Sequence, residues 1–185
     1  MPATKEEIAQ AFMILAFRYG FRRTTIEDVA KSLHISKKTV YEHFAGKEDL
    51  LEYAVELAAA EQRRRVESRL TSLTALDRVG QVIDIALADV RAFFDSSPHP
   101  EMVEPPEVTA RVNAHVYAPM VRDLLVAGAR NGEFAVDDPD TTAAFIVAIG
   151  MEAVRMIRED RSSRPETAMR RAVRRIVAGS DPHTD

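Results

Sequence analysis

The stretch TIEDVAKSLHISKKTVYEHF, residues 25–44, contains two short segments with apolar residues at helical spacing, separated by about three residues. Ile26, Val29, Ala30 and Leu33 give the first segment an apolar face. The small side chain of Ala30 allows a second helix to cross closely. Ile35 lies between the segments, where it can fill the junction. The pattern predicts a helix-turn-helix.

The second segment opens at Ser36, a good N-cap, and Val40 and Phe44 would tie it to the core. Five side chains then lie outside its apolar face: Lys37, Lys38, Thr39, Tyr41 and His43. Lysines at a helix N-terminus suit phosphates or guanine edges, and hydroxyls suit phosphate oxygens. Thr25 and Lys47, each at the start of a helix, could reach flanking phosphates. These features predict DNA contact.

Almost every other segment is also predicted to be helical, because glycine is sparse and no run alternates with period two. Four capping-box patterns mark helix starts, at Thr4…Glu7, Thr25…Asp28, Thr74…Asp77 and Ser163…Glu166. Pro119 should bend or break the sixth helix. We expect helices near 4–19, 25–32, 36–43, 47–71, 75–95, 106–131, 139–160 and 164–178.

Charge is distributed unevenly along the chain. The net charge is −4, yet residues 1–50 hold eight Lys/Arg and only seven Asp/Glu. A cationic N-terminal part on an acidic body is typical of a DNA-binding module joined to a domain of another function. We therefore predict two all-α domains: a three-helix, homeodomain-like DNA-binding domain at 1–46, and a helical effector-binding and dimerisation bundle at 47–185.

Several segments together resemble the signature of the tetracycline-repressor (TetR) family: 20–21 (GF), 24–30 (TTIEDVA), 35–44 (ISKKTVYEHF) and 47–51 (KEDLL). The resemblance implies DNA contacts at Thr25, Ser36, Lys37, Lys38, Thr39, Tyr41, His43 and Lys47. It also implies a C-terminal domain that binds a small effector and dimerises through its last two helices. His34 stands where the family usually has glycine, and we expect a left-handed backbone there. Gly46 is a weaker helix cap than the commoner Ser or Asn.

The run 143–151 (AAFIVAIGM) is apolar all round, so its helix must be covered on more than one side. One side could face a partner chain; the alternative is a fully buried helix in a monomer. Because one short recognition helix needs a second copy for strong operator binding, we favour a homodimer. The expected interface residues are Phe145, Ile149, Met156, Met169, Val173 and Ile176.

An effector pocket would be lined by adaptable apolar side chains of the fifth to seventh helices: Phe93, Phe94, Met102, Val103, Val116, Tyr117 and Met120. Simple core packing is the alternative for each of them. The acidic body and the apolar lining favour an apolar or cationic effector over a phosphorylated one.

Enzyme and metal functions find no support in the sequence. The chain has no cysteine, its five histidines are scattered, and no nucleophile elbow or phosphate loop is present. His99, Glu101, Glu104 and His115 are the one grouping of metal-ligand types, and we expect no metal and no cofactor. No signal segment or membrane span is evident, and the lack of cysteine suits the cytoplasm.

The sequence thus predicts a repressor that a small molecule releases from a palindromic operator. The long helix after Lys47 has no Pro or Gly up to Thr71, so it could transmit a rotation from body to head. Two alternatives stay open: a DNA-binding regulator without a small ligand, and a helical scaffold that binds no DNA.

Overall fold

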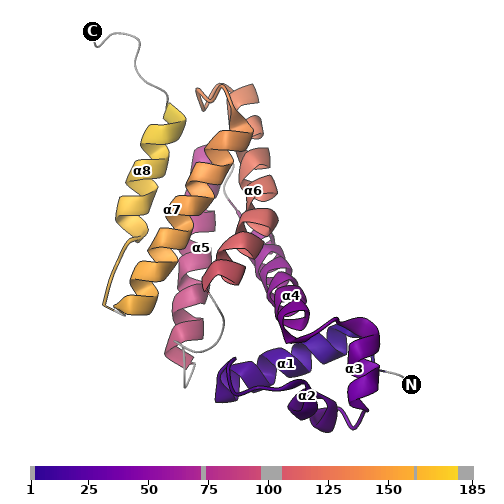
Figure 1. The fold of residues 1–185 in the computed structure, drawn as a ribbon. Coiled ribbons are helices and arrows are strands. Elements are labelled where there is room, and N and C mark those ends of the chain that lie inside the picture. Colours follow the sequence, from indigo (N-terminus) through magenta and orange to yellow (C-terminus); the bar gives the residue numbers. More distant parts are fainter. Residues whose placement is uncertain (1–2, 72–73, 97–105, 161, 179–185) are drawn as a thin grey trace. The chain divides into compact units, whose positions relative to one another are not determined.

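The computed structural model describes residues 3–71, 74–96, 106–160 and 162–178. Within these ranges every regular element is a helix, which confirms the predicted all-α fold (Figure 1). The helices are α1 (Lys5–Tyr19), α2 (Ile26–Ser32), α3 (Lys37–His43), α4 (Lys47–Ser68), α5 (Ala75–Ser96), α6 (Pro106–Arg130), α7 (Pro139–Glu159) and α8 (Glu166–Ala178).

The chain divides into two compact units. The first unit comprises residues 1–61 and 93–112, and the second unit comprises residues 62–92 and 113–185. The first part of α4 belongs to the first unit, and the domain boundary after residue 46 stays a prediction. The Tyr53 hydroxyl donates to Glu6 Oε1 at 2.8 Å, and its ring lies 5.6 Å from that of Phe44.

Reciprocal capping boxes start both α1 and α2, as predicted. Thr4 Oγ1 accepts from the Glu7 backbone at 3.2 Å, and Glu7 accepts from the Thr4 backbone at 2.8 Å. Thr25 and Asp28 repeat the arrangement, and the Thr25 hydroxyl donates to Asp28 Oδ2 at 2.6 Å. That bond is the main reason why the pKa of Asp28 lies below its usual value. Each box satisfies two backbone donors that a helix start otherwise leaves free.

Side chains from α1, α2, α3 and α4 form the core of the first unit. Phe12 of α1, Val29 of α2, Val40 of α3 and Leu50 of α4 are completely buried. Each buried side chain of this size contributes about 1.5–3 kcal/mol relative to exposure. The two helices of the helix-turn-helix are therefore held by hydrophobic packing against α1 and α4, which leaves their other faces free.

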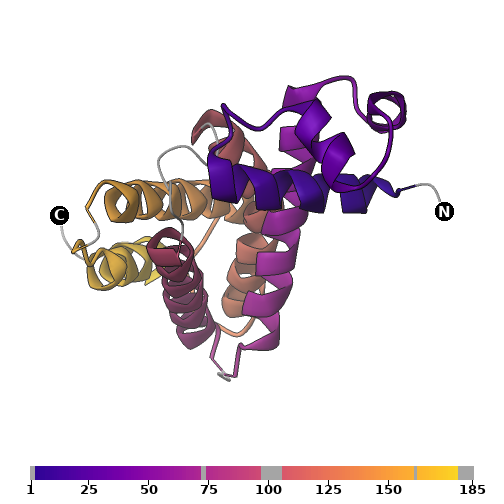
Figure 2. The same ribbon diagram turned by 90° about the horizontal axis from the view of Figure 1, so that it is seen from below.

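In the second unit, α7 and α8 lie side by side in both views (Figures 1 and 2). Gly150 of α7 permits this approach, since a Cβ there would lie only 3.3 Å from Met169 Cε of α8. Arg91 of α5 links to α8 through Glu166 at 2.7 Å, with both side chains mostly buried. The close approach at Gly150 is thus made within the chain.

A tight turn after α6 carries an unpredicted helix cap. The Glu133 and Phe134 backbones both donate to the Gly128 carbonyl, at 2.8 and 3.3 Å. The carboxylate of Glu133 then accepts from the first backbone N–H groups of α5, those of Ala75 at 2.7 Å and Leu76 at 3.3 Å. A negative charge is favourable at a helix N-terminus. This long-range cap joins α5 to the end of α6.

One expected helix start was wrong, and one expected helix break is absent. Ser163 does not cap α8, which begins at Glu166; Pro165 disfavours helical geometry in the residue before it and so delays the start. Of the bend or break expected at Pro119, the break does not occur, because α6 continues through this residue. Pro119 and His115, whose carbonyl loses its helical donor, are both exposed to solvent.

Candidate DNA-binding surface

The position of α3 is set by the turn that precedes it. His34 has a φ of 55°, the left-handed conformation expected where a glycine is usual. The Ile35 backbone donates to the Ala30 carbonyl at 2.9 Å, which closes the turn. Ser36 Oγ then accepts from the Thr39 backbone at 3.1 Å and caps α3. Caps at both ends of the turn make α3 a rigid platform for its outward side chains.

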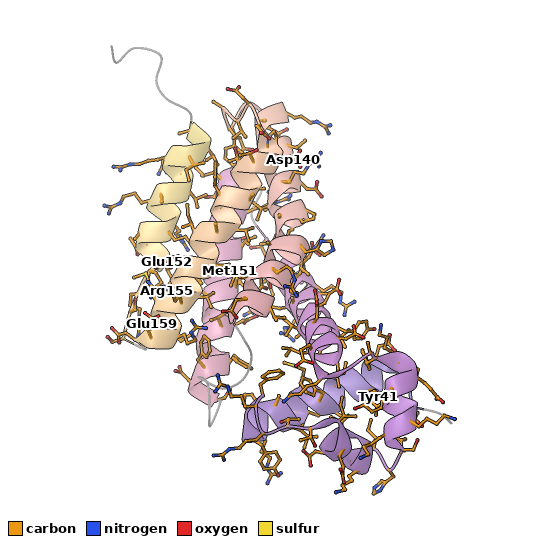
Figure 3. The ribbon with its side chains drawn as sticks, in the orientation of Figure 1. Tyr41, Asp140, Met151, Glu152, Arg155 and Glu159 are labelled. Atoms are coloured by element: carbon orange, nitrogen blue, oxygen red, sulfur yellow. The ribbon has the colours of Figure 1, made fainter. Side chains whose placement is uncertain are left out.

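Three side chains of α3 take no part in the core. The side chains of Lys37 and Lys38 are 58% and 86% exposed, and Tyr41 is an exposed aromatic residue, labelled on α3 in Figure 3. A tyrosine whose side chain is exposed to solvent contributes little to folding. These residues form the outer face of α3, a name used below for Lys37, Lys38 and Tyr41.

Two acidic side chains partly balance the outer face of α3. Glu27 of α2 lies 2.8 Å from Lys31 Nζ and 3.5 Å from Lys37 Nζ. The hydrogen bond from Lys31 is the largest cause that holds the pKa of Glu27 below its usual value. Glu42 lies 4.0 Å from Lys38. Exposed ion pairs of this kind are weak, so a phosphate could replace either carboxylate.

Other predicted contact residues already have partners within the first unit. Thr25 and Ser36 use their hydroxyls as caps, and the Thr39 and Ser36 hydroxyls lie 3.0 Å apart. Lys47 Nζ lies 4.2 Å from the centre of the Phe21 ring, and burial lowers the pKa of this amine. His43 is half-buried, with its ring 6.5 Å from that of Phe44. These residues support the surface, and their contact with DNA stays a prediction.

The predicted effector-pocket residues fall in different places. Phe93 and Phe94 belong to the first unit, where Phe93 lies 5.5 Å from Phe17. Val116 and Met120 are buried in the second unit, and Tyr117 is half-buried there. Met102 and Val103 lie outside the described residues. Asp89 of α5 is not among the predicted residues; its Oδ1 lies 3.1 Å from Arg69 Nη1, and its buried Oδ2 has no hydrogen-bond partner among the described residues.

The predicted dimer residues also separate into two groups. Phe145, Met156 and Ile176 are exposed large apolar residues, and Ile149 is half-buried. Met169 and Val173 are buried within the chain, and their part in an interface stays a prediction. The burial results from the approach of α8 to α7, which covers the apolar face of α8.

The N-terminal part of the chain is similar to known proteins. Residues 4–54 match the model of the family described as bacterial regulatory proteins, tetR family. An uncharacterised HTH-type transcriptional regulator of Bacillus subtilis, YxbF, is 34% identical over 59 residues. That match covers 31% of this chain and only 16% of the relative.

Solved structures resemble the chain over nearly its whole length. RolR in complex with resorcinol has a TM-score of 0.70 at 18% identity, and the match covers 98% of this chain and 95% of RolR. FadR of Bacillus subtilis in complex with stearoyl-CoA has a TM-score of 0.62 at 18% identity, covering 94% and 97%. These likenesses establish the fold beyond residue 54.

Two further observations concern the described residues alone. No helix among them is both long and apolar enough to cross a bilayer. They also contain no group of three or more His, Cys, Asp or Glu residues placed to hold a metal ion.

Proposed function

Residues 4–54 match the model of the TetR family, and from that premise we propose that this chain is a transcriptional repressor of the family. A homodimer binds a palindromic operator through the outer face of α3, and a small molecule releases it. The observation that carries the proposal is the outer face itself. A capped, firmly packed helix presents two lysines and a tyrosine that the fold does not use. We also propose a cytoplasmic location, since the matched family is described as bacterial regulatory proteins.

Dimerisation is proposed through the exposed stripe of α7 together with Ile176 of α8. Phe145, Ile149, Glu152 and Met156 recur in steps of four, three and four, so they share one helix face. Arg155 donates to Glu152 and Glu159 along α7, which leaves these acidic groups paired (Figure 3). A paired ionic group beside exposed Phe and Met side chains is well suited to a second copy of the same face.

The double variant Phe145→Glu/Met156→Glu is expected to weaken the dimer at least about 30-fold, since buried aromatic anchors dominate interfaces and carboxylates there would face each other. Sedimentation equilibrium measures the effect. Ile14→Glu is the matched control, because Ile14 is 67% exposed and lies on α1. A double variant that dimerises like wild type would rule out this face.

Ligand release is proposed because similar folds hold small molecules and because α4 is one helix from Lys47 to Ser68. Residues of α4 belong to both compact units, so a rotation of this helix is communicated along the chain without a flexible linker. A ligand that prefers one setting of α4 shifts the population of DNA-binding geometries.

Reciprocity supplies the test of ligand release. An inducer that weakens operator binding must itself bind more weakly to the operator complex by the same factor, typically about 5–150-fold. Ligand affinity is measured by calorimetry with and without saturating operator, after a thermal-shift screen has found a ligand. Equal affinities would refute induction, and tighter binding on operator would make the ligand a co-repressor. A screen without hits, beside intact operator binding, would favour a regulator without a small ligand.

A further inference from the structure

Two buried polar atoms in the second unit lack a hydrogen-bond partner within the described part of the chain. They are Oδ2 of Asp89 on α5 and the phenolic oxygen of Tyr117 on α6. Native proteins pair the great majority of such atoms, so each unpaired one calls for an explanation. We propose that these two atoms anchor the effector, and that the effector is a neutral, largely apolar molecule with a hydroxyl group, such as a substituted phenol. The inference rests on the proposed function and specifies the chemistry of its ligand.

Both residues are connected to one apolar cluster, Tyr117 directly and Asp89 through its neighbour on α5. The cluster consists of buried Val66, Val82 and Met120, against which Tyr117, Ile85 and other apolar side chains pack. Asp89 lies four residues after Ile85, so it shares the same face of α5 one turn further on. Ile85 and Tyr117 pack against the same cluster, so Asp89 lies one helical turn from a residue that shares this cluster with Tyr117.

The protonation of Tyr117 agrees with this geometry. Burial, and secondarily the negative charge of Asp89, raise the pKa of the Tyr117 phenol far above its ordinary value. The hydroxyl therefore stays protonated at physiological pH and keeps its donor. Together the two residues offer one donor and one charged acceptor to a ligand.

The surrounding charges favour a neutral ligand. Asp89 Oδ1 already accepts from Arg69 Nη1 at 3.1 Å, so a positive charge balances the carboxylate. Arg63 and Arg65 also act electrostatically on the Tyr117 hydroxyl. A cationic ligand would meet these guanidinium groups, and an anionic ligand would meet Asp89. A neutral hydroxyl avoids both costs: it donates to Asp89 Oδ2 and accepts from Tyr117.

The rest of the ligand must match the apolar cluster. Val66 and Val82 present only hydrocarbon, and Met120 is a flexible side chain that adapts to irregular shapes. A ring or short alkyl chain would gain hydrophobic burial there, while its hydroxyl stays at the polar edge. Of the two effector classes predicted from sequence, the structure thus favours the apolar one and adds a hydroxyl requirement.

The test uses four probes with one hydrocarbon skeleton: 4-propylphenol, its methyl ether 4-propylanisole, 4-propylbenzylamine and 4-propylbenzoate. Calorimetry on the full-length protein should show tightest binding for the phenol, and at least about tenfold weaker binding for the ether, which cannot donate. Tyr117→Phe and Asp89→Asn should each weaken phenol binding several-fold to tenfold. Tyr19→Phe, an exposed tyrosine of α1, is the matched control and should bind like wild type.

The outcomes separate the inference from the proposed function. Tyr117→Phe removes an unpaired buried hydroxyl, so its melting temperature should not fall below that of wild type; this checks folding. Phenol binding that is absent, matched by the ether or amine, or unaffected by both variants would overturn the inference, whatever ligand then releases the operator. Phenol binding that depends on Tyr117 but leaves operator affinity unchanged would instead refute ligand release and keep the site.

Discussion

Gly128→Ala is expected to destabilise the second unit by about 3 kcal/mol, because overpacking a dense core costs up to this amount or more. A Cβ at Gly128 would clash with three ring atoms of Phe134, a residue that is only 7% exposed. The ring cannot withdraw without disturbing the turn that positions Glu133 at the start of α5. In a thermal melt, the midpoint should fall by about 6–12 °C.

Gly80→Ala is the matched control for this prediction. Gly80 also lies within a helix, but a Cβ there would meet nothing closer than 3.9 Å. Replacement of a helical glycine by alanine should then stabilise by up to about 1 kcal/mol. Adding Phe134→Leu to Gly128→Ala should recover part of the lost stability, since a smaller side chain relieves the clash. A Gly128→Ala protein that melts like wild type would show that Phe134 does not pack on Gly128.

Lys37→Ala and Tyr41→Phe are each expected to weaken operator binding by about 1–3 kcal/mol, or about 5- to 150-fold, without loss of folding. Both side chains are exposed and lie outside the core, so their loss should act only through DNA. Fluorescence anisotropy over a salt series gives the affinity and its slope. If Lys37 binds a phosphate, the slope falls by about 1; if it binds a base, the preference at one position relaxes.

The control variants for this prediction remove one positive charge and one tyrosine hydroxyl from other helices. Arg130→Ala takes away an exposed charge from the end of α6, and Tyr19→Phe removes an exposed hydroxyl from α1. Both should bind operator within about twofold of wild type, because neither lies on the outer face of α3. Wild-type affinity in Lys37→Ala or Tyr41→Phe would remove that residue from the proposed contact surface.

Local signals in the sequence predicted most of the helix starts. Capping boxes at Thr4 and Thr25 depend on atoms three residues apart, so a single sequence contains all that they require. The left-handed turn at His34 follows from the same kind of local pattern. The outer face of α3 was predictable too, since the core positions of a seven-residue helix leave few alternatives.

Features that depend on contacts distant in sequence could not be predicted. Glu133 caps a helix that starts 58 residues earlier, and no local spacing announces it. Periodicity shows that α8 has an apolar face, but it does not show that Met169 and Val173 are buried within the chain. The exact start of α8 was missed because Pro165 outweighed the cap pattern at Ser163. Asp89 and Tyr117 belong to different helices, and the sequence does not show that both have a buried polar atom without a hydrogen-bond partner.

The most direct test of the account is selection of bound duplexes from a random DNA library by the purified protein, followed by measurement of stoichiometry on the selected site. The account predicts an enriched inverted repeat whose half-site centres lie about 10 base pairs, or a multiple, apart. It predicts protein chains bound in pairs, and no enrichment by the Lys37→Ala/Tyr41→Phe double variant. Absence of any enriched sequence, or a single asymmetric half-site bound by one chain, would contradict it.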